Sequence, residues 1–362
     1  MAGDKPPSTN EPGGDPNLLR ILWRDLKDFY YFYLDDERRR RLMQMSRFKQ
    51  ALYVLGWVVR ELFLRLAPAR RILLVACLVI FFWGSVQVRF GDTSLTLNLR
   101  IFSFAGLLFI LMLELKDKLL ARDELAVGRA VQLALLPDRN PELTGWSIWL
   151  YTRPANDVGG DLVDYLALPG GRLGLMLGDV AGKGLGAALL MAKLQATLRA
   201  LAPEAAALDG LGVRLNGIFC RDGLPNRFAT LVYLELHPGS GTIHVLNAGH
   251  LPPLVLGGSG LVEMEPVAPP LGILPDAEYP EQRLQLAVGD RLVAYSDGVT
   301  DARNAAGEMF GDDRLRALLV ECRTLGPADL GMRLLADILK FSGEERLPDD
   351  LSLIILQRTA QG

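Results

Sequence analysis

The pattern of apolar and polar positions changes along the chain, and each change predicts a different kind of element. Across residues 17–66, apolar side chains recur at steps of three and four residues, which is the spacing of an amphipathic helix. From Trp146 onward the pattern becomes short apolar or alternating runs separated by Gly, Pro, Asn and Asp, which is typical of strands. The predicted strand segments are SIWLYT, VDYLAL, RLGLML, FATLVYLEL, TIHVLNAG, RLVAYS and LSLIIL.

Helical periodicity returns within this strand-rich part, at residues 186–200, 209–220 and 312–341. The resulting order is strands, two helices, more strands, two helices and a last strand. This order predicts an α+β fold, because a parallel doubly wound sheet would need a regular alternation of strands and helices.

Two uncharged apolar runs lie before the strand-rich part. Residues 72–88 are at the short end of what crosses a bilayer as a helix, and residues 101–113 are shorter still. The first run begins too far along the chain to be a cleaved signal peptide. Together the runs predict a membrane hairpin of two spans over residues 72–113. The alternative is a buried helical hairpin in a soluble protein, and the length of the first run favours the membrane.

Charge around the hairpin predicts its orientation. Lys and Arg outnumber Asp and Glu before the first run, and the segment KDKLLARDE follows the second, so both ends are expected in the cytoplasm. The expected location is the inner (cytoplasmic) membrane, as a multi-pass protein with its C-terminal domain in the cytoplasm. The predicted parts are a disordered tail at 1–16, a cytoplasmic amphipathic helical region at 17–71, the hairpin at 72–113, a linker helix at 114–136 and a C-terminal domain at 137–362.

Composition excludes several classes of protein. Half of the 362 residues are apolar, which is enough for a sizeable core, and the formal net charge of −3 argues against a nucleic-acid-binding protein. The three cysteines lie far apart and form no C-x-x-C pair, so neither a disulfide framework nor a thiolate zinc site is indicated. With only three histidines, a histidine-rich metal site is also excluded.

The stretch LGDVAGKGLGAALLMA, residues 177–192, raises two alternatives, a nucleotide loop or a metal loop. A Walker loop fails because one residue is missing between the glycines and Gly184 stands where a hydroxyl belongs. Gly182, Gly184 and Ala187 fit G-x-G-x-x-A, but the acidic residue expected about 20 residues later is absent. A nucleotide-binding membrane protein is therefore disfavoured.

Aspartates recur beside glycine at the ends of several predicted strands. A single Asp-Gly pair is usually a turn, but repetition at strand ends indicates that carboxylates gather at one place. Carboxylates with almost no histidine select Mg²⁺ or Mn²⁺ over zinc. The positions are Asp161, Asp164, Asp179, Asp297, Asp301, Asp349 and Asp350.

These segments together resemble the metal-dependent (PPM-type, protein phosphatase 2C-like) serine/threonine phosphatases. Within them, the chain resembles the bacterial branch typified by the stage II sporulation protein E and the sigma-factor-regulating phosphatases. The resemblance spans about residues 125–357 and implies an antiparallel β-sandwich flanked by helices. The segments that carry it are LLPDRNPELTGWSIWLYTRPANDVGGDLVDY, LGDVAGKGLGAALLMA, NAGHLPPLVL, YSDGVTDARNAAGEMFG and DDLSLIIL.

The resemblance implies a catalytic site with two Mn²⁺ or Mg²⁺ ions. Asp179 would bridge the ions, with help from the backbone carbonyl of Val180. Asp297 and Asp349 would complete the shell of one ion, and Asp161 would act at the second.

Other residues receive lesser roles by the same resemblance. Asp164 is a weaker candidate at the second ion, and Asp350 is a secondary ligand candidate. Lys183 and Arg303 are candidates for substrate contact, although a surface lysine in a turn is the simpler interpretation of Lys183. His250 is expected to fix a turn.

The implied activity is hydrolysis of phosphoserine and phosphothreonine by a water that two metal ions activate. The resemblance implies a regulatory phosphoprotein substrate, a STAS-type anti-sigma-factor antagonist, and the linker helix could carry a signal or a homodimer contact. The alternative is a catalytically weak pseudophosphatase that binds a signalling partner. The complete set of acidic positions argues against that alternative.

Overall fold

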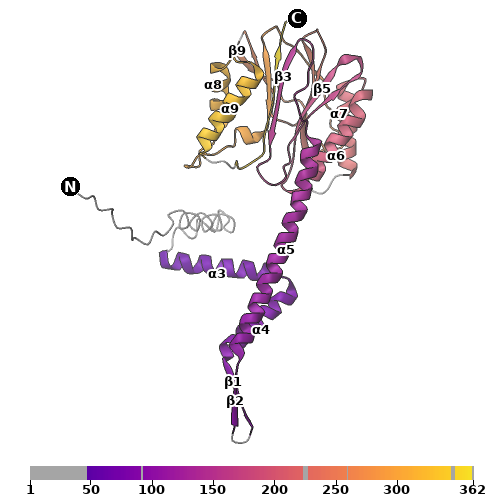
Figure 1. Cartoon of the computed structure of the whole chain (residues 1–362). Coiled ribbons are helices and arrows are strands. Elements are labelled where there is room, and N and C mark those ends of the chain that lie inside the picture. The colour runs from indigo at the N-terminus through magenta and orange to yellow at the C-terminus, as the bar shows by residue number, and fades with distance from the viewer. Residues whose placement is uncertain (1–46, 91–92, 223–226, 259, 344–346, 361–362) are drawn as a thin grey trace, which may run out of the picture. The chain divides into compact units, whose positions relative to one another are not determined.

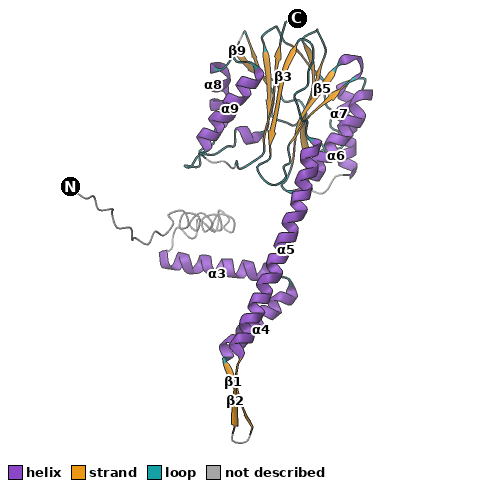
Figure 2. Ribbon diagram, viewed as in Figure 1, coloured by secondary structure: helices purple, strands orange, loops and turns teal. Residues whose placement is uncertain are grey.

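The computed structural model describes residues 47–90, 93–222, 227–258, 260–343 and 347–360. It divides into two compact units, Met1–Lys118 and Leu119–Gly362, and each is described by itself (Figures 1 and 2). The predicted tail at 1–16 and residues 17–46 of the predicted amphipathic region lie outside the described residues.

The first unit consists of helices and one β-hairpin (Figure 2). The hairpin strands pair antiparallel along their whole length. The long helix that follows continues into the second unit. The elements are α3 (Arg47–Arg65), α4 (Pro68–Trp83), β1 (Ser85–Phe90), β2 (Thr93–Asn98) and α5 (Leu99–Leu135).

Both predicted membrane runs differ in extent from the observed helices. Helix α4 ends at Trp83, five residues before the predicted end, because Gly84 takes φ +84° and the next residues alternate apolar and polar side chains as a strand does. The second predicted run and the predicted linker helix form one continuous helix, α5. No proline interrupts this stretch before Pro137, so nothing ends the helix earlier.

Among the described residues, one helical stretch combines the length and mean hydropathy that crossing a bilayer requires. It is Leu185–Glu204, and 44% of it is buried inside the protein. Most of this stretch is helix α6 (Leu185–Leu201), which packs in the core of the second unit. The membrane hairpin at residues 72–113 therefore stays a prediction.

The second unit is a sandwich of two five-stranded antiparallel sheets with helices on both outer faces (Figures 1 and 2). The predicted strand segments all form strands, and the predicted α+β sandwich is confirmed. The short strands β8, β9 and β10 are additional. The first sheet has the order β10 (Gln282–Gln285), β7 (Thr242–Ala248), β6 (Ala229–Leu236), β5 (Leu173–Val180) and β4 (Leu162–Ala167), and the second has β3 (Trp146–Arg153), β12 (Leu351–Arg358), β11 (Arg291–Tyr295), β8 (Leu254–Gly257) and β9 (Gly260–Glu263).

Alternation along the central strands builds two kinds of core. Leu175 and Leu177 of β5 pack between the sheets, whereas Met176 packs against the helices. In β12, Ile354 lies between the sheets and Ile355 faces the helices. Both faces of each central strand are therefore buried, which explains why these segments read as nearly continuous apolar runs.

Helices complete the sandwich on each side. Helices α6 and α7 (Leu208–Asp222) cover the first sheet, and α8 (Gly311–Glu321) and α9 (Pro327–Ser342) cover the second. The helical pattern at 312–341 thus contains two helices, separated where Gly326 precedes Pro327. The sheets act as a rigid support for the loops at their ends.

Candidate active site

Acidic side chains from both sheets meet at one end of the sandwich. Asp161 directly precedes β4, and Asp179 is the penultimate residue of its neighbour β5. In the second sheet, Asp297 follows β11 and Asp349 precedes β12. In an antiparallel pair, the start of one strand lies beside the end of its neighbour, so each sheet brings two aspartates together.

Glycines let these loops approach closely. A Cβ on Gly160 would lie 3.3 Å from Oδ1 of Asp179 and 3.1 Å from the carbonyl oxygen of Val180. A Cβ on Gly298 would lie 2.0 Å from the carbonyl oxygen of Asp350, which no structure tolerates. Gly160 therefore allows a close approach between two loops of the first sheet, and Gly298 is required for the close approach between two loops of the second sheet.

Asp350 links the second sheet to the loop that carries Asp161. Its Oδ1 accepts a hydrogen bond from the backbone N–H of Ala155 at 2.8 Å. Its Oδ2 accepts from the N–H groups of Gly160 at 2.6 Å and Asp161 at 3.3 Å. Because both oxygens already hold backbone groups, the structure favours a positioning role for Asp350 over the predicted role of secondary metal ligand.

Asp161 is buried, and its Oδ2 lacks a hydrogen-bond partner within the described structure. Burial raises the pKa of Asp161 well above its usual range, and the negative charge of Asp179 raises it further. Hydrogen bonds from Ser352 and Ser296 oppose this rise only in part. A buried oxygen without a partner is costly, and a bound cation would satisfy it.

Asp179 and Asp297 are perturbed in the same direction. Burial, followed by the charges of Asp297 and Asp349, raises the pKa of Asp179 to about 6. Burial, followed by the charges of Asp349 and Asp301, raises the pKa of Asp297. Like charges that raise each other's pKa lie close together, and this cluster is short of positive charge.

The donor set of the cluster fits a hard divalent cation. Carboxylates and a backbone carbonyl are the ligands that Mg²⁺ and Mn²⁺ prefer. Within the described part of the chain, no three His, Cys, Asp or Glu side chains stand around one point as a finished metal shell. The buried, unpartnered oxygen of Asp161 and the carboxylate donors around it are nevertheless of the kind that such an ion would take.

Lys183 lies beside the cluster, in contact with a predicted ligand. Its Nζ is 2.9 Å from Oδ2 of Asp349 and 3.2 Å from the carbonyl oxygen of Pro348. The flanking residues Gly182 and Gly184 have φ of +116° and +75°, conformations that favour glycine. The side chain that was predicted to contact substrate is thus an ion-pair partner of Asp349 in this structure.

Two further predicted residues lie apart from this arrangement. The buried carboxylate of Asp164 accepts two hydrogen bonds of 2.8 Å from Arg199 and one of 2.6 Å from Gln195. Because these bonds occupy its oxygens, the structure favours a structural role for Asp164 over the predicted weaker ligand role. Arg303 is exposed in a turn where it bridges to Met309, which leaves its predicted substrate contact a prediction.

His250 connects strand β6 of the first sheet to strand β11 of the second. Its Nδ1 is 2.8 Å from Oγ1 of Thr230, and its Nε2 donates to the carbonyl oxygen of Tyr295 at 3.2 Å. Its backbone N–H donates to Oδ1 of Asn247 at 2.9 Å. Burial lowers the pKa of His250 to about 4, so the ring is neutral. These contacts support the expected structural role of the histidine.

Two residues of the site were not found from the sequence. Gln132 of α5 is buried, and its side chain exchanges two hydrogen bonds with the backbone of Gly159. Arg227 donates to the carbonyl oxygen of Ala181 at 2.7 Å. A glutamine in a helix carries no sequence signal, whereas Arg227 directly precedes a predicted strand and could have been noted.

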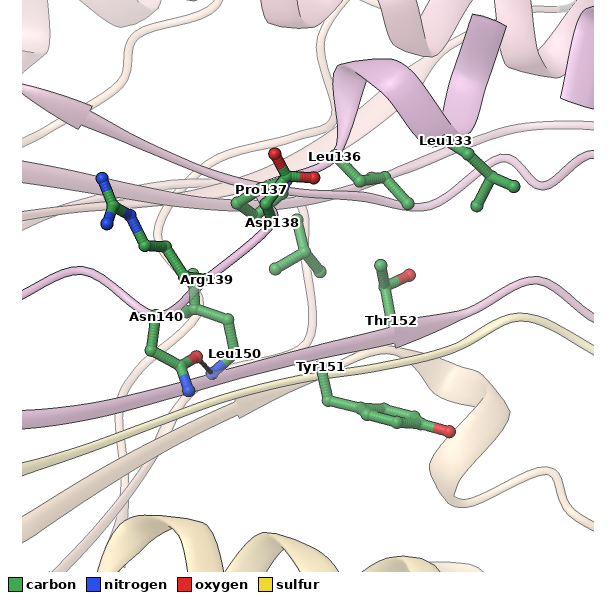
Figure 3. Close-up of a pocket in the computed structure, with 10 residues that line it drawn as sticks. Leu133, Leu136, Pro137, Asp138, Arg139, Asn140, Leu150, Tyr151 and Thr152 are labelled. Atoms are coloured by element: carbon green, nitrogen blue, oxygen red, sulfur yellow. Dashed lines mark hydrogen bonds between the residues drawn. The ribbon is translucent and has the colours of Figure 1, made fainter. Parts of the chain in front are cut away.

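A cavity of about 370 Å³ lies elsewhere, between the end of α5 and strand β3 (Figure 3). The side-chain oxygen of Asn140 accepts the backbone N–H of Leu150 at 2.8 Å across it. None of the clustered aspartates lines this cavity, so it is separate from the candidate active site.

The chain is similar to known bacterial proteins. Protein IcfG of Synechocystis sp. is 32% identical over 234 residues, which cover 57% of this chain and 37% of that protein. Phosphoserine phosphatase RsbP of Bacillus subtilis is 29% identical over 192 residues, covering 51% and 47%. The chain therefore spans less than half of the length of these two relatives.

A solved structure and a family profile agree with this similarity. The SiaA-PP2C domain of Pseudomonas aeruginosa superimposes with a TM-score of 0.57 at 20% identity, covering 67% of this chain and 98% of that one, which shows a shared PP2C-like fold. The family described as Stage II sporulation protein E (SpoIIE) matches residues 169–359, just over half of the chain. The clustered aspartates and the matching profile place the chain in one family: it belongs to the SpoIIE family.

Proposed function

We propose that this protein is a metal-dependent phosphatase that hydrolyses phosphoserine and phosphothreonine in a protein substrate. The observation that carries the proposal is the meeting of Asp161, Asp179, Asp297 and Asp349 at the end of a PP2C-like sandwich. Membership of the SpoIIE family and the similarity to a phosphoserine phosphatase support the same activity.

Two Mn²⁺ or Mg²⁺ ions are proposed as cofactors. Asp179, the Val180 carbonyl, Asp297 and Asp349 would hold one ion, and Asp179 and Asp161 the other. When bound, such ions lower the pKa of a coordinated water and neutralise the phosphoryl oxygens. Asp350 and His250 touch neither substrate nor ion in this scheme, and instead hold the loops that present the ligands.

The substrate proposed from the family resemblance is a phosphorylated STAS-type anti-sigma-factor antagonist. The cluster lies at the ends of strands β4, β5, β11 and β12, where phosphoserine on another protein can reach it. Arg303 is exposed in the turn after Asp297 and supplies a positive charge for such a partner. Sigma-factor regulation is then the process in which the activity acts.

A membrane tether is proposed from the packing inside the first unit. Ser103 is buried and donates its hydroxyl to the carbonyl oxygen of Cys77 at 2.6 Å, and Gly106 leaves room for the Cys77 sulfur. Membrane helices typically contact each other through small and polar residues and direct their large apolar side chains outward. The exposed apolar side chains include Ile72, Val79, Phe82, Ile101, Phe102, Phe104, Phe109, Leu111 and Met112.

Charged contacts mark one end of this helix pair. Arg70 pairs with Glu114 and Asp117, each at 2.6 Å, beside the basic Arg71. Arginines at one end of apolar helices, here Arg70 and Arg71, favour the cytoplasmic side for that end. The proposed location is therefore the cytoplasmic membrane, with the phosphatase domain on the cytoplasmic side.

The part of α5 that belongs to the second unit also offers a dimer contact. Leu120 and Val127 are seven residues apart and are 53% and 65% exposed, and Val131 is 58% exposed. An exposed apolar stripe with this spacing is typical of helices that pair. A homodimer through this stripe is part of the proposal.

The test is hydrolysis of p-nitrophenyl phosphate and of a phosphoserine protein by the full chain in detergent, with and without Mn²⁺. Turnover is expected to require Mn²⁺ and to be lost in Asp179→Asn. Asp209→Asn, an exposed acid at the start of α7, is the matched control and should remain active. Absence of turnover on both substrates with every divalent ion would contradict the proposal and favour the pseudophosphatase.

A further inference from the structure

The ammonium group of Lys183 lies in the negative field of the carboxylate cluster. It contacts Oδ2 of Asp349 at 2.9 Å and the carbonyl oxygen of Pro348 at 3.2 Å. The lysine therefore occupies part of the field that would hold a divalent cation.

The backbone around Lys183 is fixed, while its side chain is free to change partner. Arg227 donates to the carbonyl oxygen of Ala181 at 2.7 Å, and a Cβ on Gly182 would lie 1.6 Å from Nη1 of that arginine. Helix α6 begins two residues after Lys183. The side chain of Lys183 is 60% exposed and has four methylene groups, so its ammonium can leave Asp349 without a backbone shift.

We propose that Lys183 acts twice at this site: it competes with the divalent cation for Asp349 and, once displaced, contacts the phosphate group of the substrate. The inference rests on the proposed function. An ammonium and a divalent cation that share one carboxylate repel each other, so the lysine weakens metal binding. A phosphate dianion is then the strongest acceptor for the released ammonium, which offers three N–H donors.

The two roles predict effects of opposite sign from one substitution. Lys183→Gln removes the competing charge, and we expect Mn²⁺ to bind about tenfold more tightly, as expected for a unit charge beside a divalent ion in an exposed site. The same variant loses a charge-assisted contact to phosphate, so kcat/KM is expected to fall by roughly tenfold or more. If Lys183 were merely structural, the substitution would lower Mn²⁺ affinity and kcat/KM together.

The experiment measures Mn²⁺ affinity and phosphate binding separately on the full chain. Mn²⁺ affinity is read from the electron paramagnetic resonance signal of the free ion, without substrate. Phosphate binding is read at saturating Mn²⁺ from inhibition of p-nitrophenyl phosphate hydrolysis by inorganic phosphate. Lys183→Arg keeps the charge and should bind Mn²⁺ as the unaltered protein does. Lys193→Gln, which removes a lysine 3.5 Å from Asp222, is the matched control.

Each outcome decides a specific point. Tighter Mn²⁺ binding together with weaker phosphate inhibition in Lys183→Gln, and neither change in Lys193→Gln, supports the proposal. Unchanged or weaker Mn²⁺ binding overturns the competition, and unchanged phosphate inhibition overturns the second role. If the unaltered protein binds Mn²⁺ but hydrolyses neither substrate, the proposed function fails while the competition is still decided by the affinities.

Discussion

Gln132 and Gly159 exchange two hydrogen bonds. The side-chain Nε2 of Gln132 donates to the carbonyl oxygen of Gly159 at 2.8 Å, and the N–H of Gly159 donates to Oε1 of Gln132 at 3.0 Å. Gly159 stands two residues before Asp161, the buried carboxylate with an unpartnered oxygen. Helix α5 is therefore bonded directly to the loop that presents a proposed metal ligand.

This relationship predicts that Gln132 sets metal affinity without touching the metal. In Gln132→Leu, the loop loses both hydrogen bonds, and Mn²⁺ affinity should fall by about 10–100-fold, as for other residues that orient a ligand. Activity should recover at high Mn²⁺ concentration, because the ligands remain. Mn²⁺ titration of activity and of free-ion resonance checks both points.

Arg122, an exposed residue of α5 outside the proposed dimer stripe, is the control for Gln132. Arg122→Gln should leave Mn²⁺ affinity unchanged. If Gln132→Leu also bound Mn²⁺ normally, α5 would not act on this loop, and the hypothesis that the helix transmits a signal to the site would lose its physical basis.

Replacing Asp161 is expected to stabilise the metal-free protein and to weaken metal binding. Its carboxylate is buried, its pKa is raised by burial and by Asp179, and one oxygen is unpartnered. Asp161→Asn removes the charge, so the metal-free protein should gain about 1–3 kcal/mol in free energy of unfolding. The same variant should lose the thermal stabilisation by Mn²⁺.

Thermal unfolding with a chelator and with saturating Mn²⁺ measures the two effects separately. If Asp161→Asn were less stable than the unaltered protein in chelator, the Asp161 carboxylate would be stabilised by its neighbours in the metal-free state. That result would remove the electrostatic reason for placing a cation beside it.

The strands of the sandwich were predictable because burial on both faces produces short apolar runs, and Gly, Pro, Asn and Asp separate these runs in the sequence. Leu175, Met176 and Leu177 illustrate this, since consecutive residues face different cores. Strands β8, β9 and β10 have four residues each, too few for a pattern to emerge. The observed end of α4 depends on the conformation of Gly84, which apolar content alone does not report.

Site residues could be predicted only where acidic side chains lie at the ends of predicted strands. Asp179 and Asp297 follow this rule, and the structure brings them together. The roles of Asp164 and Asp350 depend on partners remote in sequence, such as Ala155, which lies 195 residues from Asp350. Hydrogen bonds of this kind are decided by tertiary packing, so one sequence could not separate ligands from the residues that position them.

His250 predicts a loss of stability at mildly acidic pH. Burial lowers its pKa to about 4, below the value of about 6.5 for an unfolded chain. Between these values the unfolded chain binds a proton that the folded protein does not, so stability present above pH 6.5 is lost as pH falls toward 4. The full effect is about 3 kcal/mol.

Unfolding of the metal-free protein at several pH values, compared with His250→Asn, isolates this contribution. The difference in free energy of unfolding between the two proteins should shrink as the pH is lowered from 7 to 5, because the histidine is the one titrating group that differs between them. A difference that stays constant with pH would mean that the pKa of His250 is the same in the folded and the unfolded protein, contrary to the lowering that its burial causes.

Asp161 and Asp164 lie three residues apart, and we expect the first to bind metal and the second to stabilise the fold. Asp164 is fully buried and bonded by Arg199, whose side chain is 47% exposed. Arg199→Met leaves a buried carboxylate without its cation and should destabilise the protein by about 2 kcal/mol, less than a fully buried pair because the arginine is partly solvated. The double variant Arg199→Met with Asp164→Asn should recover part of that loss, which a double-mutant cycle measures.

Below its melting temperature, Asp164→Asn should keep the Mn²⁺-dependent hydrolysis that Asp161→Asn abolishes. Loss of Mn²⁺ affinity in a folded Asp164→Asn protein would restore Asp164 to the ligand role and contradict its assignment as the anchor of Arg199.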